Sequence, residues 1–428
     1  MTLREREPKA PAGARKSLPN SVGFVLTIAM VWLGGQFVTQ GVSDASLGGD
    51  PELAVLWRGD SADAVAALAR ARLTSHNRDG AARLAAHALQ LAPLDASALA
   101  TYGLAMEQLG RQPQADQAMA VAGKLGWRDV LTQLWLFRRG LVVGDFRAAL
   151  DHADALMRRQ DDVPKALFVA LGAAAHDPRV SASLIGHLRA DPAWRAPFFV
   201  YLGGYAKPPE NDVARTLLNG LAAGATPPTN DELASYLRSL VGEQKFDQAA
   251  SDWRLFSRQP GLTGYVYDGD FQRPTGATPF DWALANGVGW SAAVTDSPGA
   301  GHGQALRVEY DGVSPPQPVR QMLVLPPGTY RLSGRAYNEG DSDPKALTWG
   351  VICLISGQVI AAVPTPAFAS AQWRAFEVEV TVPADHCPAQ WLVLSATPGD
   401  VRQDISVWYD DIVVTPIAGA IAATSQGH

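Results

Sequence analysis

Cysteine is scarce in this sequence, and the signatures of common catalytic sites are missing. The 428 residues include only two cysteines, and no two of the eight histidines stand four residues apart, the spacing that presents two metal-ligating imidazoles on one helix face. No Gly-x-Ser-x-Gly nucleophile elbow occurs, and the glycine-rich stretch 299–303 lacks the Lys-Ser/Thr of a phosphate-binding loop. The sequence therefore predicts a protein without catalytic activity and without a required cofactor.

Positive charge is also scarce in the C-terminal part of the chain. From Gly264 to the end, eight Lys and Arg residues stand against sixteen Asp and Glu residues, a net charge of −8, whereas the whole chain carries −6. Nucleic acids bind mainly to basic surfaces, because their phosphates carry negative charge. We therefore expect no nucleic-acid partner.

The N-terminal region contains a long run without any charge. No charged residue occurs from Ser17 to Ser43, whereas five Lys and Arg residues precede this run. Its apolar part, Val22 to Val38, approaches the ~20 residues that a membrane-spanning helix needs. We expect a basic cytoplasmic leader over residues 1–16, a transmembrane anchor over residues 17–43 and a linker over residues 44–60.

This arrangement predicts where the protein resides. Basic residues before a spanning helix stay in the cytoplasm, so the chain would be a single-pass protein of a bacterial inner membrane, with its N-terminus in the cytoplasm and its bulk in the periplasm. The small-x-small pattern of Ser43-Asp44-Ala45 offers an alternative, in which a signal peptide is cleaved near Ala45 and the remaining chain is secreted.

Residues 61–259 have the composition and the period of a helical repeat array. The segment is rich in Ala and Leu, with apolar residues at helical spacing. Helix starts are predicted at Asp177-Pro178, Asp191-Pro192 and Asn230-Asp231-Glu232. An Asp or Asn side chain at the cap accepts a hydrogen bond from an unpaired amide of the first turn, and a first-turn Pro has no amide hydrogen to leave unpaired. Small residues recur at intervals of 34 positions, at Ala69 and Gly103, at Ala81, Ala115 and Ala149, and at Gly110 and Gly144.

This array resembles the tetratricopeptide repeat. Gly144-Asp145-Phe146-Arg147-Ala148-Ala149-Leu150 matches the turn and second-helix opening of that family, and Pro93 fits the proline that follows the second helix. The resemblance implies an α-helical solenoid that binds a protein partner. The alternative is a spacer that only holds the C-terminal part at a distance.

Residues 260–418 read as an antiparallel β-sandwich, followed by a tail over residues 419–428. In the run from Trp373 to Thr381, Phe376, Val378 and Val380 face one side while glutamates face the other, as in a sheet with one solvated face. At least eight strands fit this region, and further examples are Gln304–Tyr310, Val319–Leu325, Thr329–Tyr337, Leu347–Leu354, Ala389–Ala396 and Ile405–Val414.

The two cysteines, Cys353 and Cys387, both lie in this β-rich region. An even pair in an exported chain favours a disulfide between two strands. The alternative is two unpaired thiols that pack as small hydrophobic side chains.

The two ends of this region resemble the jelly-roll carbohydrate-binding modules attached to bacterial glycanases. The matching segments are Asp268-Gly269-Asp270-Phe271-Gln272 with Phe280-Asp281-Trp282, and Val407-Trp408-Tyr409-Asp410-Asp411-Ile412-Val413. The resemblance implies glycan binding and a structural calcium ion held by acidic side chains of the first and last strands. The candidate calcium ligands are Asp270, Gln272, Asp410 and Asp411, although Gln272 replaces an acidic residue of the family. The alternative for Asp410 and Asp411 is a plain turn role.

Sugars bind to aromatic faces, so the candidate glycan-binding residues are aromatic. Trp408 shares strand parity with Ser406 and Asp410, which predicts that it is exposed. Trp290 lies in glycine-rich surroundings, and Tyr337 precedes Asn338-Glu339, which favours exposure of both side chains. Trp282 completes the candidate set, and the alternative for each of these aromatic side chains is packing in the core.

The fold class that follows is a multidomain α and β chain: an N-terminal transmembrane helix, an α-helical repeat solenoid of tetratricopeptide type and a C-terminal antiparallel β-sandwich of jelly-roll type. We expect a membrane-anchored periplasmic scaffold in cell-envelope or exopolysaccharide assembly or export, whose repeats bind a protein partner and whose sandwich contacts polysaccharide. The alternatives are a pure protein-interaction adaptor with a structural β domain, and a glycan hydrolase.

Overall fold

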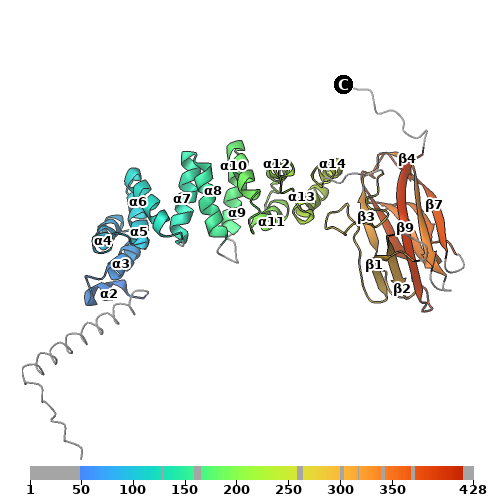
Figure 1. The fold of residues 1–428 in the computed structure, drawn as a ribbon, viewed down its shortest axis with the longest axis horizontal. Helices are drawn as coiled ribbons and strands as arrows, with labels where there is room; N and C mark the ends of the chain where they lie inside the picture. The colour runs from blue at the N-terminus through green and yellow to red at the C-terminus, as the bar shows by residue number, and fades with distance from the viewer. Residues whose placement is uncertain are drawn as a thin grey trace, which may run out of the picture. The chain divides into compact units, whose positions relative to one another are not determined.

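The computed structural model describes residues 49–127, 129–158, 165–257, 264–298, 303–316, 318–338, 343–367 and 372–417 (Figure 1). The chain divides into two compact units, one that ends at Leu156 and one that begins at Met157. The predicted leader, the predicted anchor and the C-terminal tail lie outside the described residues. Helix α2, Pro51–Trp57, lies inside the predicted linker.

The predicted localisation is corrected by the helices of the structure. Along the part of the chain that the structure describes, no helix has both the length and the apolar character needed to cross a bilayer. Because the prediction rested on a spanning helix over residues 17–43, a single-pass inner-membrane protein with a periplasmic bulk is not supported, and this prediction is withdrawn.

The first unit is built from helices that start at a constant interval. Its helices after α2 are α3 Ala62–Thr74, α4 Arg78–Leu91, α5 Ala96–Gln108, α6 Gln112–Leu125, α7 Val130–Val143 and α8 Phe146–Met157. The starts of α3, α5 and α7 lie 34 positions apart, and so do the starts of α4, α6 and α8. The helical interval thus equals the interval of small residues in the sequence, while membership of the tetratricopeptide family stays a prediction.

The recurring alanines and Gly103 are buried between helices, whereas Gly110 and Gly144 lie at exposed turns. Ala81, Ala115 and Ala149 have no exposed surface. A Cβ atom added to Gly103 would lie 2.8 Å from Cγ of Met119, so a larger side chain would push the helices apart. Gly110 and Gly144 adopt positive φ angles of 74° and 84° at the turns, a conformation that favours glycine.

The second unit begins with less regular helices. They are α9 Lys165–Ala174, α10 Pro178–Leu188, α11 Arg195–Val200, η1 Tyr201–Tyr205, α12 Asn211–Ala222, α13 Asn230–Gly242 and α14 Phe246–Phe256. The predicted starts at Pro178 and Asn230 are confirmed. The predicted start at Asp191-Pro192 is wrong, because Asp191 adopts a positive φ of 51° and α11 begins at Arg195.

The rest of the second unit is a β-sandwich. Its strands are β1 Trp290–Asp296, β2 Gln304–Tyr310, β3 Val319–Leu323, β4 Gly328–Asn338, β5 Leu347–Cys353, β6 Val359–Pro364, β7 Trp373–Val382, β8 Gln390–Ala396 and β9 Ile405–Pro416. They form a five-stranded sheet in the order β1-β2-β9-β4-β7 and a four-stranded sheet in the order β3-β8-β5-β6. All pairings are antiparallel. The helical N-terminal part and the antiparallel β C-terminal part of the predicted fold class are confirmed.

The two sheets enclose one apolar core. In β7, Phe376 and Val380 are buried while Glu377 and Glu379 are exposed, as the alternation predicts. At the start of the sandwich, the ring of Trp253 in α14 lies 5.1 Å from the ring of Phe280. Helix α14 therefore packs directly on the sandwich.

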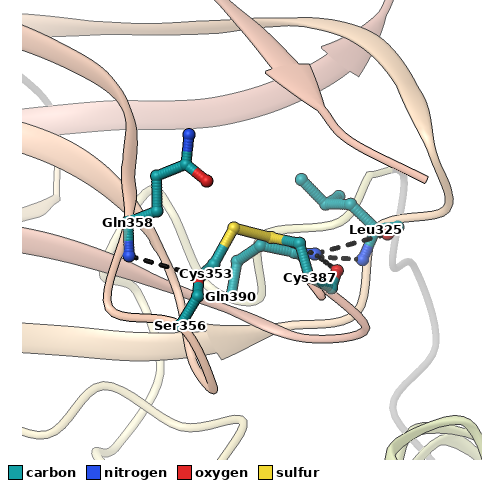
Figure 2. Close-up of a disulfide and its surroundings, with 6 residues drawn as sticks. All are labelled: Leu325, Cys353, Ser356, Gln358, Cys387 and Gln390. Carbon is teal, nitrogen blue, oxygen red and sulfur yellow. Dashed lines mark hydrogen bonds between the residues drawn. A yellow bond between two sulfur atoms is a disulfide. The ribbon is translucent and has the colours of Figure 1, made fainter. Parts of the chain in front are cut away.

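The predicted disulfide between Cys353 and Cys387 is present and buried (Figure 2). It joins the end of β5 to the segment that precedes β8. Gln390 supports this segment, because its side-chain Nε2 donates to the carbonyl of Cys387 at 2.7 Å and its Oε1 accepts from the amide of Leu325 at 2.9 Å.

Candidate ligand-binding face

The outward side of the five-stranded sheet carries the candidate site. In β9, Val407 and Tyr409 belong to the apolar core between the sheets. Because side chains alternate along a strand, Ser406, Trp408 and Asp410 point away from that core. The same alternation places on the outward side the residues of β2 and β4 that pair with them, and the residues of β7 that pair with those of β4.

One row of side chains crosses this side of the sheet. Arg307 in β2 is paired in register with Trp408 in β9, Trp408 with Tyr337 in β4, and Tyr337 with Trp373 in β7. The guanidinium carbon of Arg307 lies 4.8 Å from the centre of the Trp408 ring. The ring of Tyr337 lies 6.0 Å from that of Trp408 and 5.6 Å from that of Trp373. We call Trp408, Tyr337 and Trp373 the aromatic row.

The rings of the aromatic row differ in exposure. Trp408 is only 6% exposed, and its Nε1 donates to Oγ1 of Thr295 at 3.2 Å. Tyr337 and Trp373 are half-buried, so parts of both rings remain accessible. The accessible stacking surface therefore lies over β4 and β7, at one side of the sheet.

Charged groups surround the row, and each of the two arginines nearest to it has an acidic partner. Arg307 lies 2.8 Å from Glu309. Arg335 lies 2.9 Å from Asp410 and 2.7 Å from Asp411. Burial raises the pKa of Asp410 above its ordinary value. The hydrogen bond from the backbone amide of Asp411 and the positive charge of Arg335 each lower this pKa, but burial outweighs them. These pairs supply hydrogen-bond donors and acceptors on the outward side of the sheet.

An open groove of about 540 Å³ lies on the same side of the sheet, and it starts at the pair Arg335 and Ala375, two register positions from Tyr337 and Trp373. Its lining includes Ser333 and Arg335 from β4, Ala375 and Glu377 from β7, and Asp411 from β9. Hydroxyl, guanidinium and carboxylate groups thus flank the aromatic surface on the same side of the sheet. The arrangement suits a ligand with one apolar face and several hydroxyl groups.

The structure places the four candidate glycan-binding residues in two groups. Trp282 and Trp290 are 3% and 2% exposed and belong to the core between the sheets. Trp408 points outward as its parity predicts, but neighbouring side chains cover it. The predicted exposure of Trp290 and Trp408 is therefore wrong, while Tyr337 remains partly accessible.

We call the segment from Asp268 to Trp282 the opening motif, and Trp282 has a structural role in it. Its Nε1 donates to the carbonyl of Asp268 at 2.9 Å, and its ring packs against Phe271 and Trp349. The tryptophan thus fixes the turn at Asp268 to the core, and its ring has no free face for a ligand.

The predicted calcium ligands do not form a calcium site. They are Asp270, Gln272, Asp410 and Asp411. Arg335 binds the carboxylates of Asp410 and Asp411. The amide group of Gln272 makes two hydrogen bonds to the backbone of Gln304, at 2.8 and 3.1 Å. Within the described ranges, no group of three or more His, Cys, Asp or Glu side chains is placed to hold a metal ion. These residues do not fit calcium, which requires several free oxygen ligands.

A separate hollow of about 250 Å³ lies beside the opening motif. Asp268, Asp270, Arg273 and Asp411 line it. Burial, together with the neighbouring Asp270 carboxylate, raises the pKa of Asp268 to about 7. The Asp268 carboxyl group therefore changes its charge near neutral pH.

Sequence reasoning missed Trp373, Arg307 and Arg335 as members of the candidate face. The alternation in β7 contained a signal for Trp373, because Phe376 and Val380 face the core and Trp373 has the opposite parity. No such signal existed for Arg307, because the sequence does not show that β2 pairs with β9. The predicted absence of catalytic activity stays a prediction.

The chain was compared with known proteins. No protein-family model matches it, and no curated protein matches it. Among solved structures, it is similar to a carbohydrate-binding module of family CBM4, with 15% identity, a TM-score of 0.26, and coverage of 36% of this chain and 99% of that one. It is also similar to the CBM22-1 xylan-binding domain of Xyn10C from Paenibacillus barcinonensis, with 15% identity, a TM-score of 0.26, and coverage of 34% and 90%.

A third similar structure is TmCBM61 in complex with β-1,4-galactotriose, with 14% identity, a TM-score of 0.26, and coverage of 36% of this chain and 99% of that one. At these identities and TM-scores, the likenesses carry no conclusion on ligand or activity. The strand pairing itself defines the sandwich of this chain.

Proposed function

We propose that this chain is a carbohydrate-binding protein whose β-sandwich contacts glycan on the outward side of the five-stranded sheet. The observation that carries the proposal is the aromatic row, with its accessible rings at Tyr337 and Trp373 on the same side of the sheet as an open groove. The C–H face of a sugar ring packs against an aromatic ring, and its hydroxyl groups exchange hydrogen bonds with planar polar side chains.

The polar groups around the rings support the same ligand class. Arg335 and Glu377 line the groove, and Ser333 adds a hydroxyl group. A guanidinium group only donates hydrogen bonds and a carboxylate group only accepts them, whereas a sugar hydroxyl does both. A polyhydroxylated ligand can therefore satisfy every group of this set.

We propose a second role for the helical part, in which it binds a protein partner and the chain acts as a scaffold in the assembly or export of a polysaccharide. The supporting observation is a set of exposed apolar side chains in the first unit. Trp57, Leu91 and Leu125 end helices α2, α4 and α6 at intervals of 34 positions, with exposures of 45%, 41% and 43%. Apolar side chains exposed in a repeated position are typical of contact surfaces.

Affinity gel electrophoresis of the full chain tests the glycan-binding role. Native gels would contain soluble xylan, β-1,4-galactan or hydroxyethylcellulose, and a gel without polysaccharide is the reference. We expect retardation by at least one polysaccharide and loss of this retardation in Trp373→Ala.

Trp391→Ala is the matched control for this experiment. Trp391 lies on the outward side of the four-stranded sheet, where Arg320 lies 4.7 Å from its ring centre. This variant should keep the retardation. Unchanged mobility of the wild-type chain in every gel would contradict the proposed function and favour a protein-interaction adaptor with a structural β domain.

A further inference from the structure

Arg307 covers the central ring of the aromatic row. Its guanidinium carbon lies 4.8 Å from the centre of the Trp408 ring, a distance at which a cation and an aromatic face attract each other. Trp408 points away from the core, yet it is only 6% exposed. Neighbouring side chains on the outward side, with Arg307 over the ring and Thr295 and Tyr337 beside it, therefore cover Trp408.

Two polar side chains hold Arg307 in this position. Glu309 lies two residues along β2, and its carboxylate lies 2.8 Å from Nη2 of Arg307. Ser406 is the register partner of Glu309 in β9, and its Oγ accepts from Arg307 at 3.5 Å. The guanidinium is thus fixed from one side while its flat surface rests on Trp408.

Trp373 provides a comparison within the same row. Arg335 also approaches its ring, at 5.3 Å from the centre, but Asp410 and Asp411 bind the Arg335 guanidinium. Trp373 stays half-buried, whereas Trp408 is almost closed. Trp408 lies in the central strand β9 and Trp373 in the edge strand β7, and the arginine at Trp408 lies closer to its ring than the arginine at Trp373 does.

We propose that Arg307 is a specificity-determining residue of the face: it takes the place of a sugar ring on Trp408 and limits stacking to Tyr337 and Trp373. This inference rests on the proposed glycan-binding function. It implies that the wild-type face binds a short section of a glycan, and that removal of the Arg307 side chain adds a third stacking surface to the row.

The test measures the binding of the full chain to xylohexaose and to β-1,4-galactohexaose by isothermal titration calorimetry. For the hexaose that the wild type binds, Arg307→Ala should bind about fivefold more tightly, because one added aromatic contact contributes about 1 kcal/mol. The double variant Arg307→Ala/Trp408→Ala should lose this gain, which a purely structural role of Arg307 would not predict. Circular dichroism checks that each variant is folded.

Arg320→Ala is the matched control, because it removes the corresponding arginine from Trp391 on the other sheet. It should leave the affinity unchanged. Unchanged or weaker binding by folded Arg307→Ala would overturn the inference, and weaker binding would identify Arg307 as a direct sugar ligand. If the wild type binds neither these hexaoses nor any polysaccharide of the gel panel, the proposed function itself fails, and the inference fails with it.

Discussion

Among single residues, Asp268 shows how the fold of the opening motif changes the pKa of a carboxyl group. Its carboxyl group accepts from the amide of Arg273 at 3.1 Å and lines the same hollow as Asp270. Burial and the nearby Asp270 carboxylate disfavour the ionised form and raise the pKa of Asp268 to about 7. In the unfolded chain the same group titrates near its ordinary value of about 3.9.

This shift predicts that the sandwich loses stability as the pH rises. Between the unfolded and the folded pKa of Asp268, the folded chain holds a proton that the unfolded chain has released, so the free energy of unfolding falls with rising pH across this window. We expect Asp268→Asn to weaken this dependence between pH 5 and pH 7, measured by urea unfolding at several pH values. Asp400→Asn on an exposed loop is the control. An unchanged pH dependence in Asp268→Asn would contradict the assignment.

At the scale of elements, close contacts between backbones decide which residues the helices tolerate. Gly203 lies in η1, and a Cβ atom added to it would lie 2.5 Å from the carbonyl carbon of Ser235 in α13. Backbone atoms cannot yield as a flexible side chain can. The neighbouring Gly204 has no atom within 4 Å of the corresponding position.

Gly203→Ala should therefore destabilise the second unit by about 3 kcal/mol, because the added methyl group forces η1 away from α13. Gly204→Ala should change the free energy of unfolding by less than about 1 kcal/mol. Urea unfolding followed by circular dichroism measures both variants. Equal stability of the two variants would show that η1 and α13 do not pack as described.

The disulfide between Cys353 and Cys387 should also contribute measurably to the free energy of unfolding. It links cysteines separated by 34 positions and so removes conformational freedom from the unfolded sandwich. The double variant Cys353→Ala/Cys387→Ala should lose about 4 kcal/mol of unfolding free energy, by the chain-entropy relation for a loop of this length. Urea unfolding followed by tryptophan fluorescence gives the value. Dithiothreitol should destabilise the wild type and leave the variant unchanged, and a reductant effect on the variant would point to another cause.

Elements also differ in how well the sequence predicts them. The predicted bounds of strand β2, Gln304 and Tyr310, agree with the structure. Apolar and polar residues alternate clearly in this strand, and turn-forming residues flank it. None of the strand ranges delimited in the sequence covers β1 or β6. β1 contains Ser and Ala, which have weak strand preference, and β6 lies at an edge of its sheet, where only one neighbouring strand stabilises it.

At the scale of the whole molecule, the sequence predicts local periodicity better than it predicts which elements meet. In the first unit, the interval between helix starts equals the 34-residue recurrence of small residues, because each repeat packs on its neighbours in the same way. The outward direction of Trp408 follows from strand parity. Its burial does not, because Arg307 reaches it only through the pairing of β2 with β9, which are about 100 residues apart in sequence.

The same reason explains the error on calcium. The acidic residues of the first and last strands of the motif suggest a shared cation site, but β4 pairs with β9 and brings Arg335 to Asp410 and Asp411. An arginine in this place supplies the positive charge that a calcium ion would have supplied. The order of the strands in the sheet decides whether an arginine or a calcium ion can lie beside Asp410 and Asp411, and a single sequence does not reveal this order.

The central claim is that the accessible rings of the five-stranded sheet bind glycan, and the affinity of the Trp373→Ala variant tests it most directly. Isothermal titration calorimetry with the polysaccharide that retards the wild-type chain gives the dissociation constant. The account predicts about fivefold weaker binding by Trp373→Ala, since a lost stacking contact costs about 1 kcal/mol, and unchanged binding by Trp391→Ala. Equal affinity of the wild type and Trp373→Ala, with both proteins folded, would contradict the account.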